Sequence, residues 1–308
     1  MDKRFNDLNS YFRSIFGCRV QKITIDAGFS CPNRDGKIST GGCIYCNTRG
    51  SGTGAHAKGY SVTDQILAGK KALSRRYKAK KFMAYFQSYT NTYAPLDDLK
   101  RLYEEALSIE GVVGLSIGTR PDCVDEPVLK LIESYAKTHL MWIEYGLQSV
   151  HDQSLVLINR GHDFHCFKDA VDATLNRGIK ICSHVILGLP EETRSHMIET
   201  ATTIAKMGID GIKIHLLYVI KGTKLERLYR KGSYTCLKQQ QYVDLVCDFL
   251  ERIPKEMVIQ RLTGDPHPEE LVAPGWSIKK AQTLSLIKET LEKRNSWQGK
   301  FSQINLTT

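Results

Sequence analysis

The sequence predicts an α/β fold built on a parallel sheet, and three observations lead to this prediction. Six segments of strand character alternate with segments of helical periodicity between residues 20 and 217, which implies parallel strands joined by right-handed crossovers. The strand segments are apolar and rich in β-branched residues, as in strands buried on both faces. A chain of 308 residues can form one large barrel or a barrel with an appendage. A doubly wound sheet and a β/α barrel, full or partial, both satisfy these observations.

Each element of this alternation has its own signal. Large apolar residues recur near helical spacing at 5–16, which indicates an amphipathic helix that packs on the main body. Pro95 precedes another helical pattern, as proline commonly does at a helix start. Helices are expected at 5–16, 63–78, 96–109, 126–137, 152–158, 164–177 and 193–207. Strands are expected at 20–25, 81–86, 112–117, 140–147, 180–187 and 211–217, and 50–54 is a glycine-rich flexible stretch.

Beyond residue 220 the alternation lapses. Helical patterns occupy 237–253 and 278–294, and 257–262 is compatible with a strand. We expect residues 1–218 to form the core, with an N-terminal helix and the barrel, and 219–308 to form an extension that packs on the barrel and closes its side.

Composition places the protein in the cytoplasm. No apolar run approaches the roughly 20 residues that a membrane helix needs, so no membrane partner is expected. The first residues lack the apolar segment of a signal peptide. Nine cysteines, an odd number, favour a reducing compartment over a disulfide framework.

The net charge of +10 is concentrated in two basic runs, at 70–81 and 221–231. Basic surfaces near a site attract nucleic acid by counterion release. Either run alone is also compatible with a solvated helix face. The two together, with a basic stretch around the cysteines at 31–46, favour a nucleic-acid partner.

Three cysteines, Cys31, Cys43 and Cys46, lie in one loop directly after the first strand. Three thiolates can hold three irons of a cubane cluster and leave the fourth iron without a protein ligand. A closed zinc site normally takes four protein ligands, and this loop has a single C-x-x-C pair. Zinc, or an inert Cys31 beside a redox pair, are the alternatives to an open cluster.

Polar residues recur where successive strands end, and these ends meet at the ligand-binding edge of both candidate folds. Each alone could be an ordinary hydrogen-bonded residue. Together they suit a ligand with carboxylate, amine and ribose groups. The candidates are Thr119, Glu144, Gln148, Arg160, His184, Lys213 and His215.

These features together resemble the radical S-adenosylmethionine (SAM) superfamily, and specifically the YtqA/YhcC-type proteins of its Elp3-like branch. The likeness covers nearly the whole chain, and Cys31, Cys43 and Cys46 match the cysteines of the family signature. The resemblance implies a partial (β/α)6 TIM-type barrel with a C-terminal α/β extension. It also implies a 4Fe–4S cluster whose open iron chelates SAM, and reductive cleavage of SAM to a 5′-deoxyadenosyl radical.

The resemblance also assigns roles around SAM. Arg160 would pair with the SAM carboxylate, and Glu144 and Gln148 would contact amine or ribose groups. His184 stands where relatives often place a ribose-binding acid. The Gly-Gly-Glu-like motif of the family is replaced by 87–92, so Gln87 and Ser88 would act there largely through backbone groups.

The YtqA-like relatives suggest a substrate: tRNA wobble uridine, whose carboxymethylaminomethyl group at C5 would be shortened to aminomethyl. A flavodoxin- or ferredoxin-type donor would supply electrons. Alternatives are a small-molecule substrate such as a porphyrin precursor, and a non-catalytic metal-bearing nucleic-acid binder. Candidates for a residue that acts on the product radical, by position alone, are His215, Tyr218 and Cys182. The oligomeric state stays open.

Overall fold

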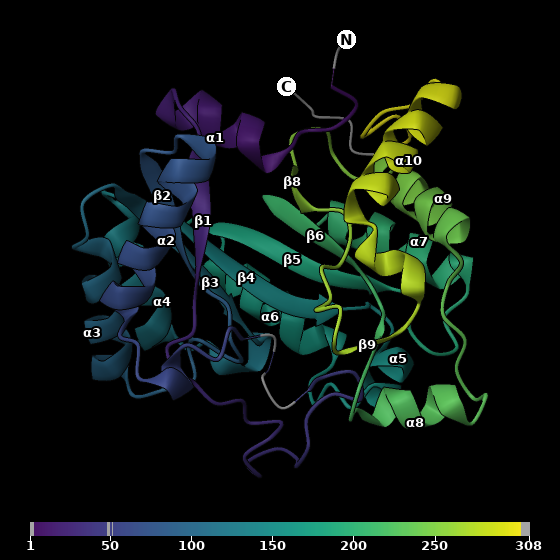
Figure 1. The fold of residues 1–308 in the computed structure, drawn as a ribbon, viewed down its shortest axis with the longest axis horizontal. Coiled ribbons are helices and arrows are strands. Elements are labelled where there is room, and N and C mark those ends of the chain that lie inside the picture. Colours follow the sequence, from purple (N-terminus) through teal and green to yellow (C-terminus); the bar gives the residue numbers. More distant parts are fainter. Residues whose placement is uncertain (1–2, 48–49, 51, 303–308) are drawn as a thin grey trace.

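A computed structural model describes residues 3–47, 50 and 52–302. Its main sheet has seven parallel strands in the order β1-β2-β3-β4-β5-β6-β8 (Figure 1). These strands are β1 (Val20–Ile25), β2 (Lys81–Phe86), β3 (Val112–Thr119), β4 (Leu140–Gln148), β5 (Lys180–Leu187), β6 (Gly211–Leu216) and β8 (Val258–Arg261). A separate antiparallel pair joins β7 (Val219–Ile220) to β9 (Leu271–Ala273).

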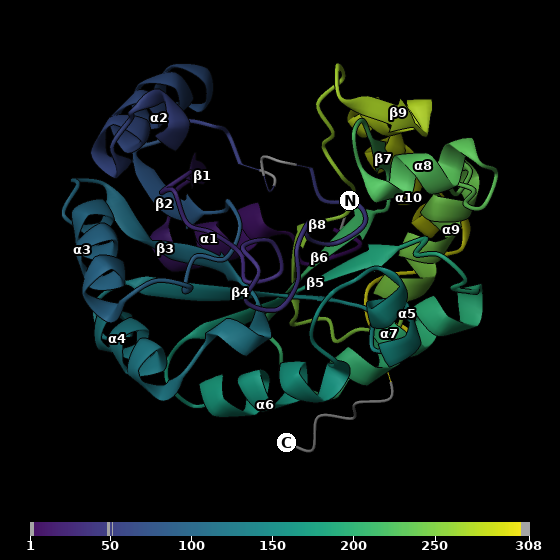
Figure 2. The same cartoon turned by 90° about the horizontal axis from the view of Figure 1, so that it is seen from below.

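The helices form an arc outside the curled sheet (Figure 2). They are α1 (Leu8–Phe16), α2 (Val62–Tyr77), α3 (Leu96–Leu107), α4 (Glu126–Ala136), α5 (Asp152–Leu157), α6 (Phe164–Thr174), α7 (Arg194–Ala205), α8 (Lys224–Arg230), α9 (Gln239–Leu250) and α10 (Lys280–Lys293). Three short 3₁₀ segments occupy His56–Lys58, Pro121–Cys123 and Gly275–Ile278. Helices and outer strand faces share the largest apolar core.

The sheet does not close on itself, since β1 and β8 are its two edges. Side chains nevertheless bridge the opening on the concave face of the sheet, which we call the lumen. The Lys22 ammonium on β1 donates to the Gln260 side-chain oxygen on β8 at 2.6 Å. The predicted partial α/β barrel is therefore confirmed. The sheet has one strand more than the six expected, because β8, from the expected extension, pairs in parallel with β6.

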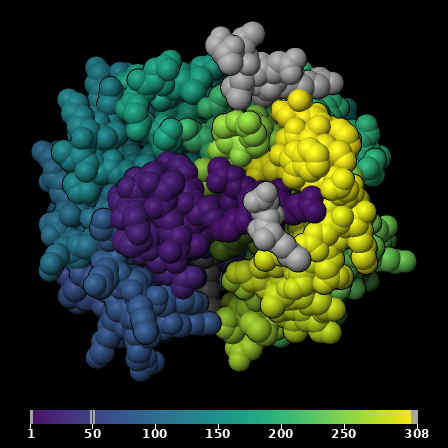
Figure 3. Space-filling view, turned by 90° about the horizontal axis from the view of Figure 1, so that it is seen from above, coloured from purple at the N-terminus to yellow at the C-terminus, as the bar shows by residue number. Residues whose placement is uncertain are grey.

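Helix α1 covers the end of the lumen at which the strands begin. Phe12 of α1 packs in a buried cluster with Val20, Trp142 and Cys182, and Tyr11 meets the Trp142 ring edge-on at 5.6 Å. Figure 3 shows the N-terminal segment lying across this face. An apolar plug therefore fills the end of the lumen at which the strands begin. A reactive site is confined to the other end, at which the strands finish.

Local signals account for most element boundaries. Ser61 and Asp64 form a reciprocal capping box that starts α2, and Asp125 caps α4 through the Val128 N–H at 3.0 Å. The expected helix at 5–16 begins only at Leu8, where Asp7 caps it. The short elements β7, α8 and β9 were not expected.

The expected flexible stretch at 50–54 includes residue 51, which lies outside the described residues. The boundary expected at residue 218 stays a prediction. In the described part of the chain, no helix has the length and apolar character required to cross a membrane.

Candidate active site

The cysteine loop leaves β1 at the end of the sheet where the strands finish. Cys31, Cys43 and Cys46 are free thiols, and Cys43 is buried. Burial raises the pKa of Cys46 to about 11, and the negative charges that Cys43 and Cys31 would carry contribute to this increase. The three thiols are thus electrostatic neighbours, and bound metal would relieve their mutual repulsion.

Nitrogen donors approach the sulfur atoms of this loop. The Asn33 amide lies 3.7 Å from Cys43 Sγ, the Arg34 guanidinium 3.6 Å from Cys46 Sγ, and Arg160 Nη1 3.8 Å from Cys43 Sγ. Hydrogen bonds to thiolate sulfur stabilise an anionic cluster and tune its potential. No group of three or more His, Cys, Asp or Glu side chains among the described residues could hold a single metal ion. A cubane cluster instead places each thiolate on a different iron.

The segment after α5 fastens the cysteine loop to the barrel. Asn33 donates to the Asn159 carbonyl at 2.6 Å, and Asn159 donates to the Gly42 carbonyl at 2.8 Å. Gly161 has a φ of 77°, and a Cβ there would lie 2.8 Å from the Asn33 side-chain oxygen. Glycine is therefore required for this close approach. The junction brings Arg160 to the cysteines although 117 residues separate it from Cys43.

Arg160 and Gln148 lie close together at the end of β4. The Arg160 guanidinium donates twice to the Gly146 carbonyl, at 3.1 and 2.6 Å. A Cβ on Gly146 would lie 2.5 Å from Arg160 Nη2 and 2.8 Å from Gln148 Nε2. The Arg120 guanidinium donates to the Arg160 carbonyl at 2.8 Å and fixes this arrangement. Their roles toward SAM stay predictions.

The loop at 87–92 lies beside the cysteine loop. The Gln87 N–H donates to the Ile25 carbonyl, and the Thr90 N–H donates to the Ser30 carbonyl, each at 3.2 Å. Within the part of the chain that the structure describes, Ser88 Oγ, Thr90 Oγ1 and Asn91 Oδ1 are buried without a hydrogen-bond partner. Buried polar atoms normally find partners, so this loop suits a polar ligand such as SAM. Thr119 Oγ1 is instead held by Thr92 Oγ1 at 2.6 Å.

Glu144 is the centre of a charged network in the lumen. Its carboxylate is fully buried and accepts from Lys22 at 2.7 Å, from His184 at 2.9 Å and from Lys213. Burial opposes its ionisation, but Lys213 and Lys22 hold the pKa of Glu144 well below its usual range. Burial lowers the pKa of Lys213 to about 7, although the Glu144 charge raises it. Any contact of Glu144 with SAM would compete with these three donors.

The candidates for action on a product radical occupy different places. His215 lies against His184, with ring centroids 5.3 Å apart. Tyr218 packs so closely on Gly264 that a Cβ there would lie 2.5 Å from its ring. Cys182 belongs to the apolar plug, but it also pairs with Glu144 in the register of β4 and β5. His215 and Cys182 therefore both border the charged network.

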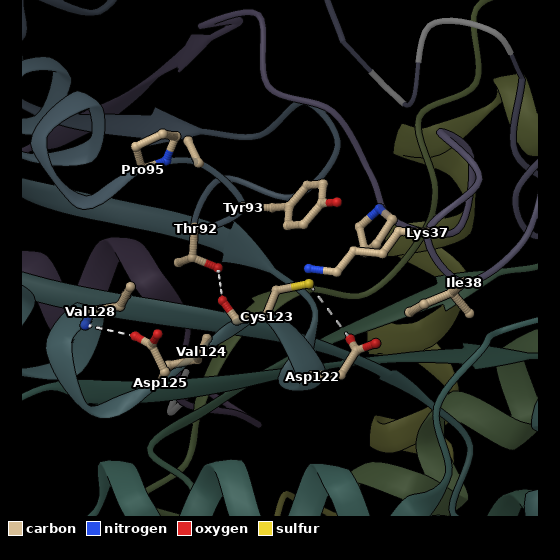
Figure 4. A pocket seen from close by; sticks show the side chains of 12 residues that line it. Lys37, Ile38, Thr92, Tyr93, Pro95, Asp122, Cys123, Val124, Asp125 and Val128 are labelled. Atoms are coloured by element: carbon tan, nitrogen blue, oxygen red, sulfur yellow. Dashed lines mark hydrogen bonds between the residues drawn. The ribbon is translucent and has the colours of Figure 1, made fainter.

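A cavity of about 560 Å³ lies outside the cysteine loop (Figure 4). Pro32, Lys37 and Ile38 of the loop line one side of it, and Tyr93 and Cys123 contribute from the loops after β2 and β3. The Lys37 ammonium lies 5.2 Å from the centroid of the Tyr93 ring. None of the predicted site residues lines this cavity.

Sequence reasoning missed several residues of the site. Lys22 lies in the middle of β1, two residues after Val20. Because side chains alternate between the two faces of a strand, Lys22 shares the face of Val20, which packs inside the lumen. This alternation is the signal that could have placed Lys22 in the lumen. Arg34 lies three residues after Cys31, and its proximity to Cys46 follows from the loop path. Arg261 follows a register irregularity between β6 and β8 that the sequence does not reveal.

A curled half-barrel with three cysteines of one loop at its carboxyl edge defines a cluster-dependent enzyme of the SAM-radical class. The family comparisons agree. The model of the radical SAM superfamily matches residues 35–204, and that of the Radical_SAM C-terminal domain matches 209–293. The chain belongs to the radical SAM superfamily. Its cofactors are a 4Fe–4S cluster and SAM, as predicted.

The similar proteins include the expected ones. The chain is 44% identical to the uncharacterized protein YtqA of Bacillus subtilis over 302 residues, covering 98% of this chain and 94% of YtqA. It is 37% identical to the protein YhcC of Escherichia coli K12 over 262 residues, covering 85% and 84% respectively. The predicted YtqA/YhcC-type relationship is confirmed.

More distant similarity reaches the Elp3 branch. Identity is 26% over 185 residues with a tRNA uridine(34) acetyltransferase of Methanocaldococcus infernus, covering 59% of this chain and 34% of that protein. The solved structure of the archaeal Elp3 of M. infernus superposes with a TM-score of 0.70 at 19% identity. It covers 91% of this chain and 64% of the Elp3 chain, and it shares the fold.

Proposed function

We propose that this radical SAM enzyme acts on tRNA and shortens the carboxymethylaminomethyl group on C5 of wobble uridine to aminomethyl. Cys31, Cys43 and Cys46 would hold the cluster. When bound, the cluster and SAM supply a radical able to remove hydrogen from an unactivated C–H group. Such a group lies next to nitrogen in the proposed substrate.

The residues beside the cysteine loop would position SAM. Arg160 would pair with the SAM carboxylate while its contact with Gly146 holds the guanidinium in place. The Gln148 side chain and the His184 ring would contact the amine or ribose groups of SAM. The unpartnered oxygens of the 87–92 loop would accept the amine hydrogens.

The observation that carries the tRNA proposal is the position of α8. The Leu225 N–H donates to the Ile44 carbonyl at 2.8 Å, which fastens this helix to the cysteine loop. The basic residues on and beside α8 are exposed: Lys221, Lys224, Arg227, Arg230 and Lys231. A polyanion bound there would lie next to the site. The similarity to a tRNA uridine(34) acetyltransferase supports the same substrate class.

Depletion tests this proposal in cells. tRNA nucleosides are profiled by mass spectrometry in a strain depleted of the protein and in its parent. Carboxymethylaminomethyluridine should accumulate at the expense of aminomethyluridine, and an unchanged uridine profile would refute the tRNA function. The proposed reaction also implies a cytoplasmic enzyme served by a flavodoxin- or ferredoxin-type donor.

A further inference from the structure

Arg261 lies at the end of β8, close to the charged network of the lumen. Ile212 of β6 pairs with Ile259, but the next residue, Lys213, pairs with Arg261, so Gln260 is an extra residue on β8. An extra residue re-aims the side chains that follow it. Gln260 reaches the lumen, where it accepts a hydrogen bond from Lys22.

The register places Arg261 on the lumen face of β8, and its charge acts on neighbouring side chains of the lumen. Burial lowers the pKa of His184 to about 4 and that of His215 well below its usual range, and the charge of Arg261 contributes to both shifts. It also contributes to the low pKa of Lys213, after burial. Because Lys213 and Arg261 are register partners in neighbouring parallel strands, their side chains leave the sheet on the same face, and Lys213 lies in the lumen against Glu144.

Within the part of the chain that the structure describes, this guanidinium is an unpaired cation. Among the described residues, no ion pair or hydrogen bond joins the Arg261 side chain to another group, and the residue is half-buried. Arginine stays charged at all relevant pH values, and a charge that has left bulk water normally has a partner. The partner expected here is an anion.

The charge balance of the lumen points the same way. Lys22 and Arg261 are cationic and Lys213, with its pKa of about 7, is partly so, whereas Glu144 is the carboxylate that contacts both lysines. His184 and His215 are neutral at pH 7, given their lowered pKa values. The network as described therefore carries more positive than negative charge.

Two neutral donors lie in the same region without partners. His215 Nε2 and Gln260 Nε2 are buried, and neither has a hydrogen-bond partner in the described structure. Both nitrogens can donate to oxygen in a suitable tautomer or rotamer. A planar carboxylate, with four lone-pair sites, could accept from these groups and from a bidentate guanidinium together.

We propose that Arg261, assisted by His215 and Gln260, binds a carboxylate of the substrate. The inference rests on the proposed function, because the carboxymethylaminomethyl group ends in a carboxylate. Holding that carboxylate at β8 would direct the adjacent C–H group toward the cysteine end of the lumen. It would also distinguish substrate from product, since the aminomethyl group has no carboxylate.

The test compares two forms of one tRNA, bearing either carboxymethylaminomethyluridine or aminomethyluridine, bound to the anaerobically purified holoenzyme with SAM. The wild type should bind the carboxylate form about 10- to 100-fold more tightly, as expected for a charge-assisted hydrogen bond. Arg261→Gln should remove this preference, and Arg261→Lys should restore part of it. Arg75→Gln on the exposed side of α2 is the matched control and should keep the preference.

The outcomes separate this inference from the proposed function. A wild type that converts the tRNA but binds both forms equally, or an Arg261→Gln variant that keeps the preference, overturns the inference alone. Loss of SAM binding in Arg261→Gln also overturns it, since Arg261 would then serve the cofactor. A wild type that does not convert the tRNA contradicts the proposed function, and the inference falls with it.

Discussion

At the scale of single residues, the buried carboxylate of Glu144 determines the character of the lumen. This carboxylate contacts Lys22 of β1, Lys213 of β6 and His184 of β5. The ring of Tyr85 lies against both ammonium groups, at 4.1 Å from Lys213 and 4.8 Å from Lys22. Because β1 is an edge strand that β2 and β3 separate from β4, the contact of Lys22 with Glu144 ties the two sides of the open barrel together.

Substituting Glu144→Gln should therefore destabilise the fold. Removing one charge from a buried network leaves cations without compensation and costs about 3 kcal/mol or more. Urea unfolding measures the change in the free energy of unfolding. The control is Asp265→Asn, whose partner Lys280 is well exposed, and which should cost under about 1 kcal/mol. Equal, small losses in both variants would show that the Glu144 network adds no stability.

Three half-buried histidines predict acid sensitivity. Burial lowers the pKa of His184 to about 4 and of His162 to about 3, and that of His215 lies well below its usual range. Below about pH 6.5 the unfolded chain therefore binds protons that the folded chain does not. The contribution of these neutral histidines to stability is present above that pH and is lost as the pH falls toward 4. The free energy of unfolding then decreases by about 1.4 kcal/mol per pH unit for each histidine.

This slope is measured by urea unfolding between pH 7 and 5. His215→Asn should make it shallower by about 1.4 kcal/mol per pH unit. His165→Asn, at a side chain that is 77% exposed, should leave the slope as it is. A slope that does not change in His215→Asn would contradict the assignment of a neutral, half-buried His215.

The proposed role of the three cysteines as cluster ligands permits a direct prediction. Cys43→Ala should lower bound iron and reduce SAM cleavage by more than about 100-fold, because a three-thiolate site loses one ligand. Far-ultraviolet circular dichroism should stay unchanged, since the loop lies outside the strands. Cys18→Ala, at a residue that precedes β1 and so lies at the other end of the sheet from the site loop, should keep iron and cleavage. Full turnover and iron content in Cys43→Ala would refute the ligand assignment.

At the scale of elements, the two basic runs have different positions. Each helix that follows a strand in a parallel sheet runs back antiparallel to it, so α2 carries the 70–81 run toward the start of β2. Lys81 indeed contacts the Phe16 carbonyl of α1 at 3.5 Å, at the plugged end of the lumen. The second run adjoins the cysteine loop through α8. Charge counting in the sequence could not separate these two locations.

A matched pair of variants tests the role of α8. Replacing Lys224, Arg227 and Lys231 with glutamine should weaken tRNA binding and reduce its salt slope by about 3, one for each lost phosphate contact. Replacing Lys71, Arg75 and Lys80, which are exposed at the opposite end, removes the same charge. Binding is measured by filter retention between 50 and 200 mM salt. Equal losses in both variants would refute docking at α8.

At the scale of the whole molecule, periodicity predicted most of the architecture. Six of the seven main strands and their helices follow from alternation, since parallel strands and amphipathic helices leave strong patterns. The seventh strand was not placed in the sheet because a short segment such as 257–262 carries no information on its pairing partner. Its position depends on the β6–β8 register, which is set by tertiary packing.

Part of the candidate site could be proposed from the sequence. Cysteine spacing and strand-end positions single out the three thiols, Gln148 and Arg160, because these residues belong to local motifs, and their roles stay predictions. The engagement of Glu144 by two lysines and the unpaired state of Arg261 depend on curvature that brings β1, β4, β6 and β8 together. Such contacts across the lumen leave no mark on sequence spacing.

The central claim is tested most directly by one reaction. Anaerobically reconstituted enzyme, reductant and SAM are incubated with tRNA that bears carboxymethylaminomethyluridine, and the nucleosides are quantified by mass spectrometry. The account predicts aminomethyluridine at the wobble position, formed only with SAM present and absent with the Cys43→Ala enzyme. Cleavage of SAM with no change in the tRNA nucleosides would contradict it.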